Sequence, residues 1–208
     1  MAKRITNIGV HHTGGLLNDP YAKTQHLTAE QVDAIHKERY EMQSTLGRWG
    51  GYNFYIGRDG SVTQFRAIGE ETAAQRGHNF DTISICLAGN FSKRNGFYIE
   101  YPELMQTVAF ANLALSIFNG SVWNKYKVIT GTELAIPYRN ILPHRALQAG
   151  TECYGGLPDS WSRDVLIDSL RSQISIIQKL ILKLQDMMKL KPLGGAKAHG
   201  CFEEDNRG

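Results

Sequence analysis

Apolar and polar positions in the first part of the chain predict several strands. Ile5–Val10 and Thr82–Ala88 are short, nearly continuous apolar runs, which is typical of buried strands. The second run has the character of a central strand. Tyr52–Arg66, YNFYIGRDGSVTQFR, contains two alternating runs on either side of Arg-Asp-Gly. This pattern predicts a β-hairpin, because glycine adopts the positive φ of a tight turn at little cost.

Two other segments have the apolar spacing of helices. The first begins at Thr28, which can form a capping box with Gln31, and is expected to reach about Ser44. Its predicted inner face carries Val32 and Ile35. The second covers 102–118, and its predicted inner face has spacings of four, three and four: Leu104, Val108, Ala111 and Leu115. The order of strands and helices predicts an α/β or mixed α+β domain, with a central mixed sheet flanked by helices.

The pattern changes at Trp161. Apolar residues then alternate at spacings of three and four for three heptads: Ile167, Leu170, Ile174, Ile177, Ile181, Leu184 and Met188. This repeat predicts a long helix that could form a parallel homodimer through 167–188. Leu166, Ile176 and Leu180 widen the apolar face beyond a strict seam, which favours the alternative of a helix packed on its own domain. We therefore divide the chain into a domain at 1–160, a heptad helix at 161–191 and a flexible tail at 192–208.

Composition narrows the possible classes of protein. With 208 residues, of which 42% are hydrophobic and 21% charged, the chain can bury a full core. A net charge of +3 without a long Lys/Arg run gives no reason to expect nucleic acid as a partner. No apolar run is long enough to predict a membrane span. Three cysteines and the absence of a signal-peptide pattern predict synthesis in a reducing cytoplasm.

The segment 142–156, LPHRALQAGTECYGG, carries the candidate chemistry. It contains His144 and Cys153, and imidazole and thiolate are ligands that zinc prefers. A catalytic zinc ion typically takes three protein ligands and leaves one position for water. The pair His11-His12, directly after the first predicted strand, offers the third ligand. The residues by themselves leave open which of these two histidines it is.

Four motifs, in order between Ile5 and Leu157, resemble those of one family: VHHTGG, GGYNFYIGRDGSVTQFR, NFDTISICLAGNF and PHRALQAGTECYGG. They are similar to motifs of the zinc-dependent N-acetylmuramoyl-L-alanine amidases of the type-2 amidase and peptidoglycan-recognition-protein superfamily, which includes phage lysozyme-like amidases. Each motif is weak alone, and together they are specific. The resemblance implies hydrolysis of the bond between N-acetylmuramic acid and L-alanine in peptidoglycan.

The resemblance also implies roles for individual residues. It makes His11, His144 and Cys153 the ligands of Zn²⁺, with His11 preferred over His12. It makes Tyr52 a catalytic tyrosine that positions the attacking water or donates to the oxyanion. It implies that Thr151 stabilises the oxyanion. The structural alternatives are an aromatic side chain that fills the sheet face for Tyr52 and a turn-forming residue for Thr151.

Some positions depart from the family pattern, and several functions stay open. Ala74 stands where a histidine is common, and Ala146 replaces an acidic residue, so contacts with the substrate are in doubt. Recycling enzymes of the superfamily usually have aspartate at the position of Cys153, which favours the phage-like branch. We expect an endolysin released through a holin, or a virion component, acting on the cell wall. The alternatives are a cytosolic muropeptide-recycling amidase and a non-catalytic peptidoglycan-binding or regulatory module.

Overall fold

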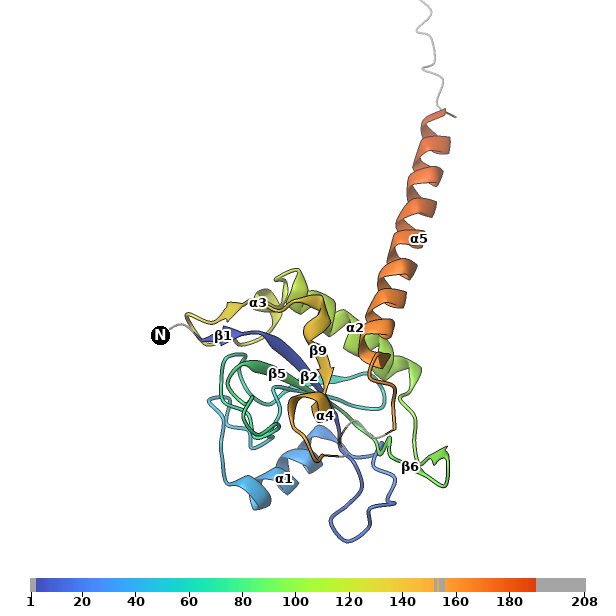
Figure 1. Cartoon of the computed structure of the whole chain (residues 1–208). Helices are drawn as coiled ribbons and strands as arrows, with labels where there is room; N and C mark the ends of the chain where they lie inside the picture. Colours follow the sequence, from blue (N-terminus) through green and yellow to red (C-terminus); the bar gives the residue numbers. More distant parts are fainter. Residues whose placement is uncertain (1–2, 152, 154–155, 190–208) are drawn as a thin grey trace, which may run out of the picture. The chain divides into compact units, whose positions relative to one another are not determined.

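The computed structural model describes residues 3–151, 153 and 156–189 (Figure 1). The chain divides into two compact units, Met1–Ser169 and Leu170–Gly208. The tail predicted at 192–208, with His199 and Cys201, lies outside the described residues.

A five-stranded sheet in the order β4-β3-β5-β2-β9 forms the centre of the first unit (Figure 1). The strands are β2 (Asn7–His12), β3 (Phe54–Ile56), β4 (Val62–Gln64), β5 (Thr82–Leu87) and β9 (Ile141–Pro143). Neighbouring strands are parallel except for the antiparallel β3–β4 pair, which is the predicted hairpin. The mixed sheet is confirmed, and β5 is its middle strand.

The remaining strands are short. β1 (Arg4–Ile5) pairs with β8 (Glu133–Leu134), and β6 (Lys93–Arg94) pairs with β7 (Phe97–Tyr98). The sequence did not predict them, because two residues are too few to show a period. Short helical turns complete the second half: α3 (Val122–Lys125), a 3-10 turn (Tyr138–Asn140) and α4 (His144–Leu147).

Helix α1 (Ala29–Tyr40) has the predicted capping box between Thr28 and Gln31. It ends before the expected Ser44, because Glu41 adopts a left-handed conformation with φ 49°. Val32 is buried as predicted, but Ile35 is 42% exposed and does not face the core. His36 is buried instead, which follows from its position one helical turn after Val32.

Helix α2 (Leu104–Phe118) forms where predicted, but its buried side differs from the expected one. Leu104 is 74% and Val108 44% exposed, whereas Ala111 is buried as expected. The side chains that enter the core are those of Phe110, Ala111, Leu113, Ala114 and Ile117. The segment is apolar on most of its circumference, so spacing alone could not select the buried side.

Strand alternation sends side chains to two separate clusters. On one face Ile83, Ile85 and Leu87 of β5 pack in the larger cluster, which also contains Phe110 of α2. On the other face Cys86 packs in a smaller cluster with α1 residues such as Val32. The sheet is therefore covered on both faces, as its parallel pairing requires.

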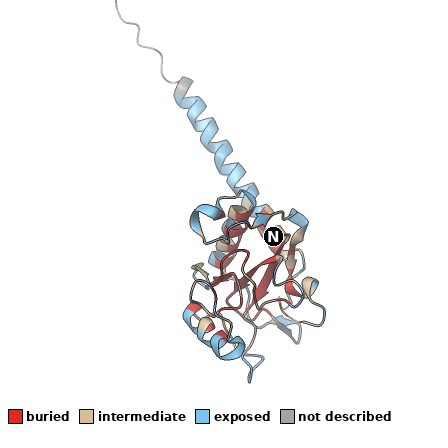
Figure 2. Ribbon diagram, turned by 90° about the vertical axis from the view of Figure 1, so that its left-hand side faces the viewer, coloured by how far each residue is buried: buried red, intermediate tan, exposed pale blue. Residues whose placement is uncertain are grey.

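Helix α5 (Trp161–Lys189) contributes differently to the two units. In the first unit, Leu166 is buried in the larger cluster, with Trp161 and Val165 packed against it. In the second unit, the side chains of 170–187 are exposed (Figure 2). No described helix is long and apolar enough to cross a membrane.

Candidate metal centre

Two adjacent parallel strands bring the candidate histidines together. Val10 of β2 is in register with Pro143 of β9, so the carboxyl ends of both strands lie at the same edge of the sheet. His11 follows Val10 within β2, and His144 directly follows β9 as the first residue of α4. Their ring centroids are 4.5 Å apart. The sheet topology therefore joins positions that are distant in the sequence.

His11 and His12 have different surroundings, because consecutive strand residues point to opposite faces. His11 is in register with Cys86, which lies in the α1-side cluster. The His12 ring lies 5.7 Å from the Phe91 ring, and its Nδ1 accepts a hydrogen bond of 2.9 Å from the Phe91 amide. Among the described residues, the potential metal-binding group contains His11, His144 and Cys153 and omits His12.

Gly9 makes room for this arrangement. A Cβ at this position would lie 3.0 Å from Leu147 of α4 and 3.3 Å from His11 Nε2. The glycine before the histidine pair therefore allows α4 to approach the sheet closely.

The loop after α4 supplies the third side chain. Cys153 Sγ lies 3.6 Å from His11 Nδ1, and the candidate ligand atoms of the three residues all lie within 4.8 Å of one another. The Thr151 hydroxyl accepts a 3.1 Å hydrogen bond from the Cys153 amide. Arg145 donates to the Leu157 carbonyl at 2.6 Å and forms an ion pair with Asp159, which connects the two ends of the loop.

The donor atoms fit a zinc ion. His144 Nδ1 is buried and has no hydrogen-bond partner in the described part of the chain. Such an atom normally has a partner, and a metal ion would supply one. Two imidazole nitrogens and one thiolate form a three-ligand set that is characteristic of catalytic zinc, with a fourth position open.

Electrostatics favour neutral imidazoles at this centre. Burial lowers the pKa of His11 well below its ordinary value, and neighbouring His144 lowers it further, against the opposite effect of a hydrogen bond to Gln75. Burial also lowers the pKa of His144, with a smaller opposing effect from Gln148. Both rings are therefore uncharged at neutral pH, which is the form that binds a metal ion.

Tyr52 borders the centre. Its half-buried ring lies 5.2 Å from the His11 ring and 5.3 Å from the His36 ring. Burial raises the pKa of the phenol well above its ordinary value, and the thiols of Cys86 and Cys153 raise it further. The phenol therefore keeps its proton at neutral pH and can donate a hydrogen bond.

Three residues near the centre were missed by the sequence interpretation. His36 is 9% exposed, and its Nδ1 accepts a 2.8 Å hydrogen bond from the Gly51 amide. Burial is the main reason that its pKa falls to about 4. Gln75 and Gln148 accept hydrogen bonds from the candidate ligand histidines. Only the helical spacing after Val32 could have indicated His36, and no local pattern marks the glutamines.

Two adjoining cavities extend from the centre. One, of about 340 Å³, is lined by the three candidate ligands, Tyr52 and Arg94, among others. The other, of about 650 Å³, is lined by residues of the 13–27 loop and of α1, including the apolar Leu27, Val32 and Ile35. Both share Leu16, Tyr40 and Tyr52 in their walls, so together they form a groove that runs from the candidate centre along α1.

The family of the chain follows from a comparison with family models. Residues 1–156 match the model described as N-acetylmuramoyl-L-alanine amidase, Amidase_2, so this chain belongs to that family. The matched range contains His11, His144, Tyr52 and Cys153. Comparison with curated protein sequences gives no match.

Several solved structures are similar to the chain. The endolysin LysCS, an N-acetylmuramoyl-L-alanine amidase from Clostridium intestinale, is 25% identical with a TM-score of 0.49, covering 74% of this chain and 76% of that one. The Ph2119 endolysin of a Thermus scotoductus bacteriophage is 18% identical with a TM-score of 0.48, covering 80% and 87%. Drosophila peptidoglycan recognition protein SD is 20% identical with a TM-score of 0.49, covering 77% and 80%.

Proposed function

We propose that this protein is a zinc-dependent amidase that hydrolyses the bond between N-acetylmuramic acid and L-alanine in peptidoglycan. The observation that supports this most is the group of His11, His144 and Cys153 at the end of an open groove, within a chain of the amidase family. A bound Zn²⁺ ion would lower the pKa of a water molecule and polarise the lactyl carbonyl of the substrate.

Protein groups around the centre have distinct tasks in this reaction. The metal ion is held by His11, His144 and Cys153. The groove along α1 binds the peptidoglycan substrate. The Tyr52 phenol, which keeps its proton, donates a hydrogen bond to the oxygen that becomes negative as water adds to the carbonyl carbon. The Thr151 hydroxyl accepts from the Cys153 amide and still has a proton to donate to the same oxygen. The C–N bond then breaks, and the alanine nitrogen leaves as an amine with a proton from the attacking water.

Metal analysis combined with product analysis tests this function. We expect about one zinc ion per chain, and loss of turbidity from purified peptidoglycan that a chelator abolishes. The products should contain new N-terminal alanine and no new reducing sugar ends. Zinc without turnover on peptidoglycan or soluble muropeptides would instead support a non-catalytic peptidoglycan-binding or regulatory module.

We further propose that the enzyme acts as a phage or prophage endolysin or as a virion-associated lysin. Cys153 at the third ligand position supports this assignment over a muropeptide-recycling amidase. The relative rates of hydrolysis of intact sacculi and of soluble anhydro-muropeptides distinguish a lysin from a recycling amidase. A lysin should clear sacculi, whereas a recycling enzyme should act only on the soluble substrate.

Helix α5 supports a proposal about assembly, namely that two copies pair through 167–188 as a parallel coiled coil. The seam residues Ile174, Ile177, Ile181 and Leu184 are 48–58% exposed. The positions next to the seam carry Arg171, Gln173, Gln178, Leu180, Gln185 and Met187. Only Arg171 is charged, and in a parallel pair it faces the apolar Leu166 of the other copy, so no like charges meet. Burial of these apolar side chains would stabilise the dimer.

A further inference from the structure

The two candidate ligand histidines share one hydrogen-bonding arrangement. His11 Nε2 lies 2.9 Å from Gln75 Oε1, and His144 Nε2 lies 3.1 Å from Gln148 Oε1. In each ring Nδ1 is then the remaining nitrogen. His11 Nδ1 faces Cys153 Sγ, and His144 Nδ1 is buried without a hydrogen-bond partner among the described residues.

The orientation of the Gln75 amide is determined by its other partners. Its nitrogen donates to the His78 carbonyl at 3.1 Å, and a carbonyl oxygen can only accept. The Ser84 hydroxyl donates to its oxygen at 2.9 Å. The Gln75 oxygen is therefore the atom that faces His11, and it requires a proton on His11 Nε2. A neutral imidazole protonated at Nε2 has its lone pair on Nδ1.

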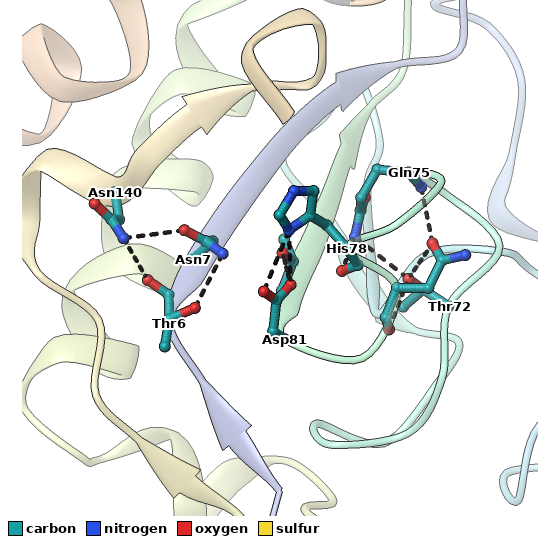
Figure 3. Close-up of polar contacts among 9 residues, drawn as sticks. Thr6, Asn7, Thr72, Gln75, His78, Asp81 and Asn140 are labelled. Atoms are coloured by element: carbon teal, nitrogen blue, oxygen red, sulfur yellow. Dashed lines mark hydrogen bonds and ion pairs between the residues drawn. The ribbon is translucent and has the colours of Figure 1, made fainter. Parts of the chain in front are cut away.

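The loop that carries Gln75 is itself held in place. The Asn79 side-chain oxygen accepts from the amides of Ala74 and Gln75, at 3.2 and 2.9 Å. The side chains of Thr72 and Gln75 lie beside each other in this loop, just before β5 (Figure 3). Gln75 therefore presents a fixed acceptor to His11.

Gln148 is oriented by the same loop. The amide of Arg76, the residue after Gln75, donates to Gln148 Oε1 at 2.7 Å. This bond identifies the oxygen as the atom that also faces His144 Nε2, which must then carry the proton. One loop thus positions both acceptors, through a side chain at Gln75 and through the backbone at Arg76.

We propose that Gln75 and Gln148 are paired positioning residues that set both ligand histidines to the Nε2-protonated tautomer, so that Nδ1 of each ring binds the metal ion. The proposal rests on the zinc centre of the proposed function. Without the glutamine oxygens, each ring could rotate or change tautomer before binding the metal. Groups that orient ligands in this way typically change metal affinity by about ten- to a hundredfold.

Zinc affinity of full-length variants, measured by competition with a chromophoric chelator, tests the proposal. Gln75→Met and Gln148→Met should each weaken zinc binding about ten- to a hundredfold. Gln148→Glu, which keeps an acceptor, should stay within about threefold of the unmodified chain. Gln64→Met is a matched control, because the Gln64 amide contacts the Lys127 and Arg66 backbone and no histidine. Folded methionine variants with unchanged zinc affinity would overturn the proposal.

A second measurement does not depend on variants that must fold or on bound zinc. Nitrogen-15 NMR of the metal-free chain at neutral pH, with labelled histidine, reports which ring nitrogen carries the proton. We expect Nε2–H on both His11 and His144, and Nδ1–H on either ring would refute the proposal. If the unmodified chain binds no zinc, the proposed function fails, whereas the tautomers still decide this inference.

Discussion

At the scale of single residues, Cys153 is the candidate ligand whose chemistry is hardest to replace. We expect Cys153→Ser to lower zinc affinity by more than about a hundredfold and to abolish amidase activity, because an alcohol is a far poorer zinc ligand than a thiolate. Zinc content after dialysis and peptidoglycan turnover are the measurements. Cys86→Ala is the control, since this buried thiol lies outside the ligand group and should not be needed for zinc. Full activity of Cys153→Ser would refute the ligand assignment.

Tyr52 is expected to affect the chemical step and not the binding of metal. Tyr52→Phe should retain zinc but lower kcat about a hundredfold, because it removes a hydrogen-bond donor to the developing oxyanion. Tyr55→Phe is a matched control: Tyr55 donates to the Leu27 carbonyl at 2.7 Å, and its loss should affect stability without changing turnover. Loss of zinc in Tyr52→Phe would mean that this tyrosine has a structural role.

His36 connects stability to pH. Its pKa is about 4 in the folded chain against an ordinary value of 6.5, so the unfolded chain binds more protons between these values. His36 therefore makes its full contribution to the free energy of unfolding above pH 6.5. This contribution falls by about 3 kcal/mol as the pH drops to 4.

Denaturant unfolding of the metal-free protein at pH 7 and pH 4.5 measures this effect. In His36→Asn, the amide oxygen can still accept from Gly51 but no longer titrates in this range. The variant should lose less stability than the unmodified chain over the same interval. Equal losses in both proteins would show that His36 is not the titrating group.

At the scale of elements, the apolar seam of α5 predicts the oligomeric state. Replacing both Ile174 and Ile181 by glutamate would place four like charges in the seam between the two helices of the coiled coil. We expect the full-length variant to have half the mass of the unmodified protein in analytical ultracentrifugation. Glutamates at Ser172 and Ser175, which lie outside the seam, should leave the dimer intact. A monomeric unmodified chain would contradict the proposed pairing.

Elements with a local signal were predicted well from the sequence. The capping box at Thr28, the Arg-Asp-Gly hairpin and the apolar run of β5 each appear where their residues indicate. β9 escaped prediction because its three residues, Ile141–Pro143, become a strand only by pairing with β2. The predicted inward side of α2 was wrong, because spacing alone does not select the buried side of a helix that is apolar on most of its circumference.

The candidate centre shows the same difference between local and distant information. The motif resemblance named His11, His144, Cys153 and Tyr52, and the fold brings all four side chains to one cavity. It gave no indication of Gln75 or Gln148. Their bonds to the histidines depend on how the 72–79 loop meets α4, and that is a tertiary contact without a sequence period.

At the scale of the whole molecule, zinc should stabilise the fold. The ligands connect β2 to the loop after α4, and a ligand that binds only the folded state raises stability by mass action. Free zinc at one hundred times its dissociation constant should add about 2.7 kcal/mol, which is a rise of several degrees in Tm. Thermal unfolding with zinc and with a chelator measures the shift. Cys153→Ser should show no shift, and an unchanged Tm in the unmodified chain would contradict the centre.

The separation of the metal ligands along the chain also affects how the protein is made. His11 and Cys153 are 142 residues apart, and β9, a partner of β2, is the last strand in the described part of the chain. In the proposed centre, a nascent chain therefore cannot hold zinc with all three ligands until Cys153 has been synthesised. We expect truncated translation products that stop before Cys153 to be inactive as amidases, because they would lack one ligand of the proposed centre.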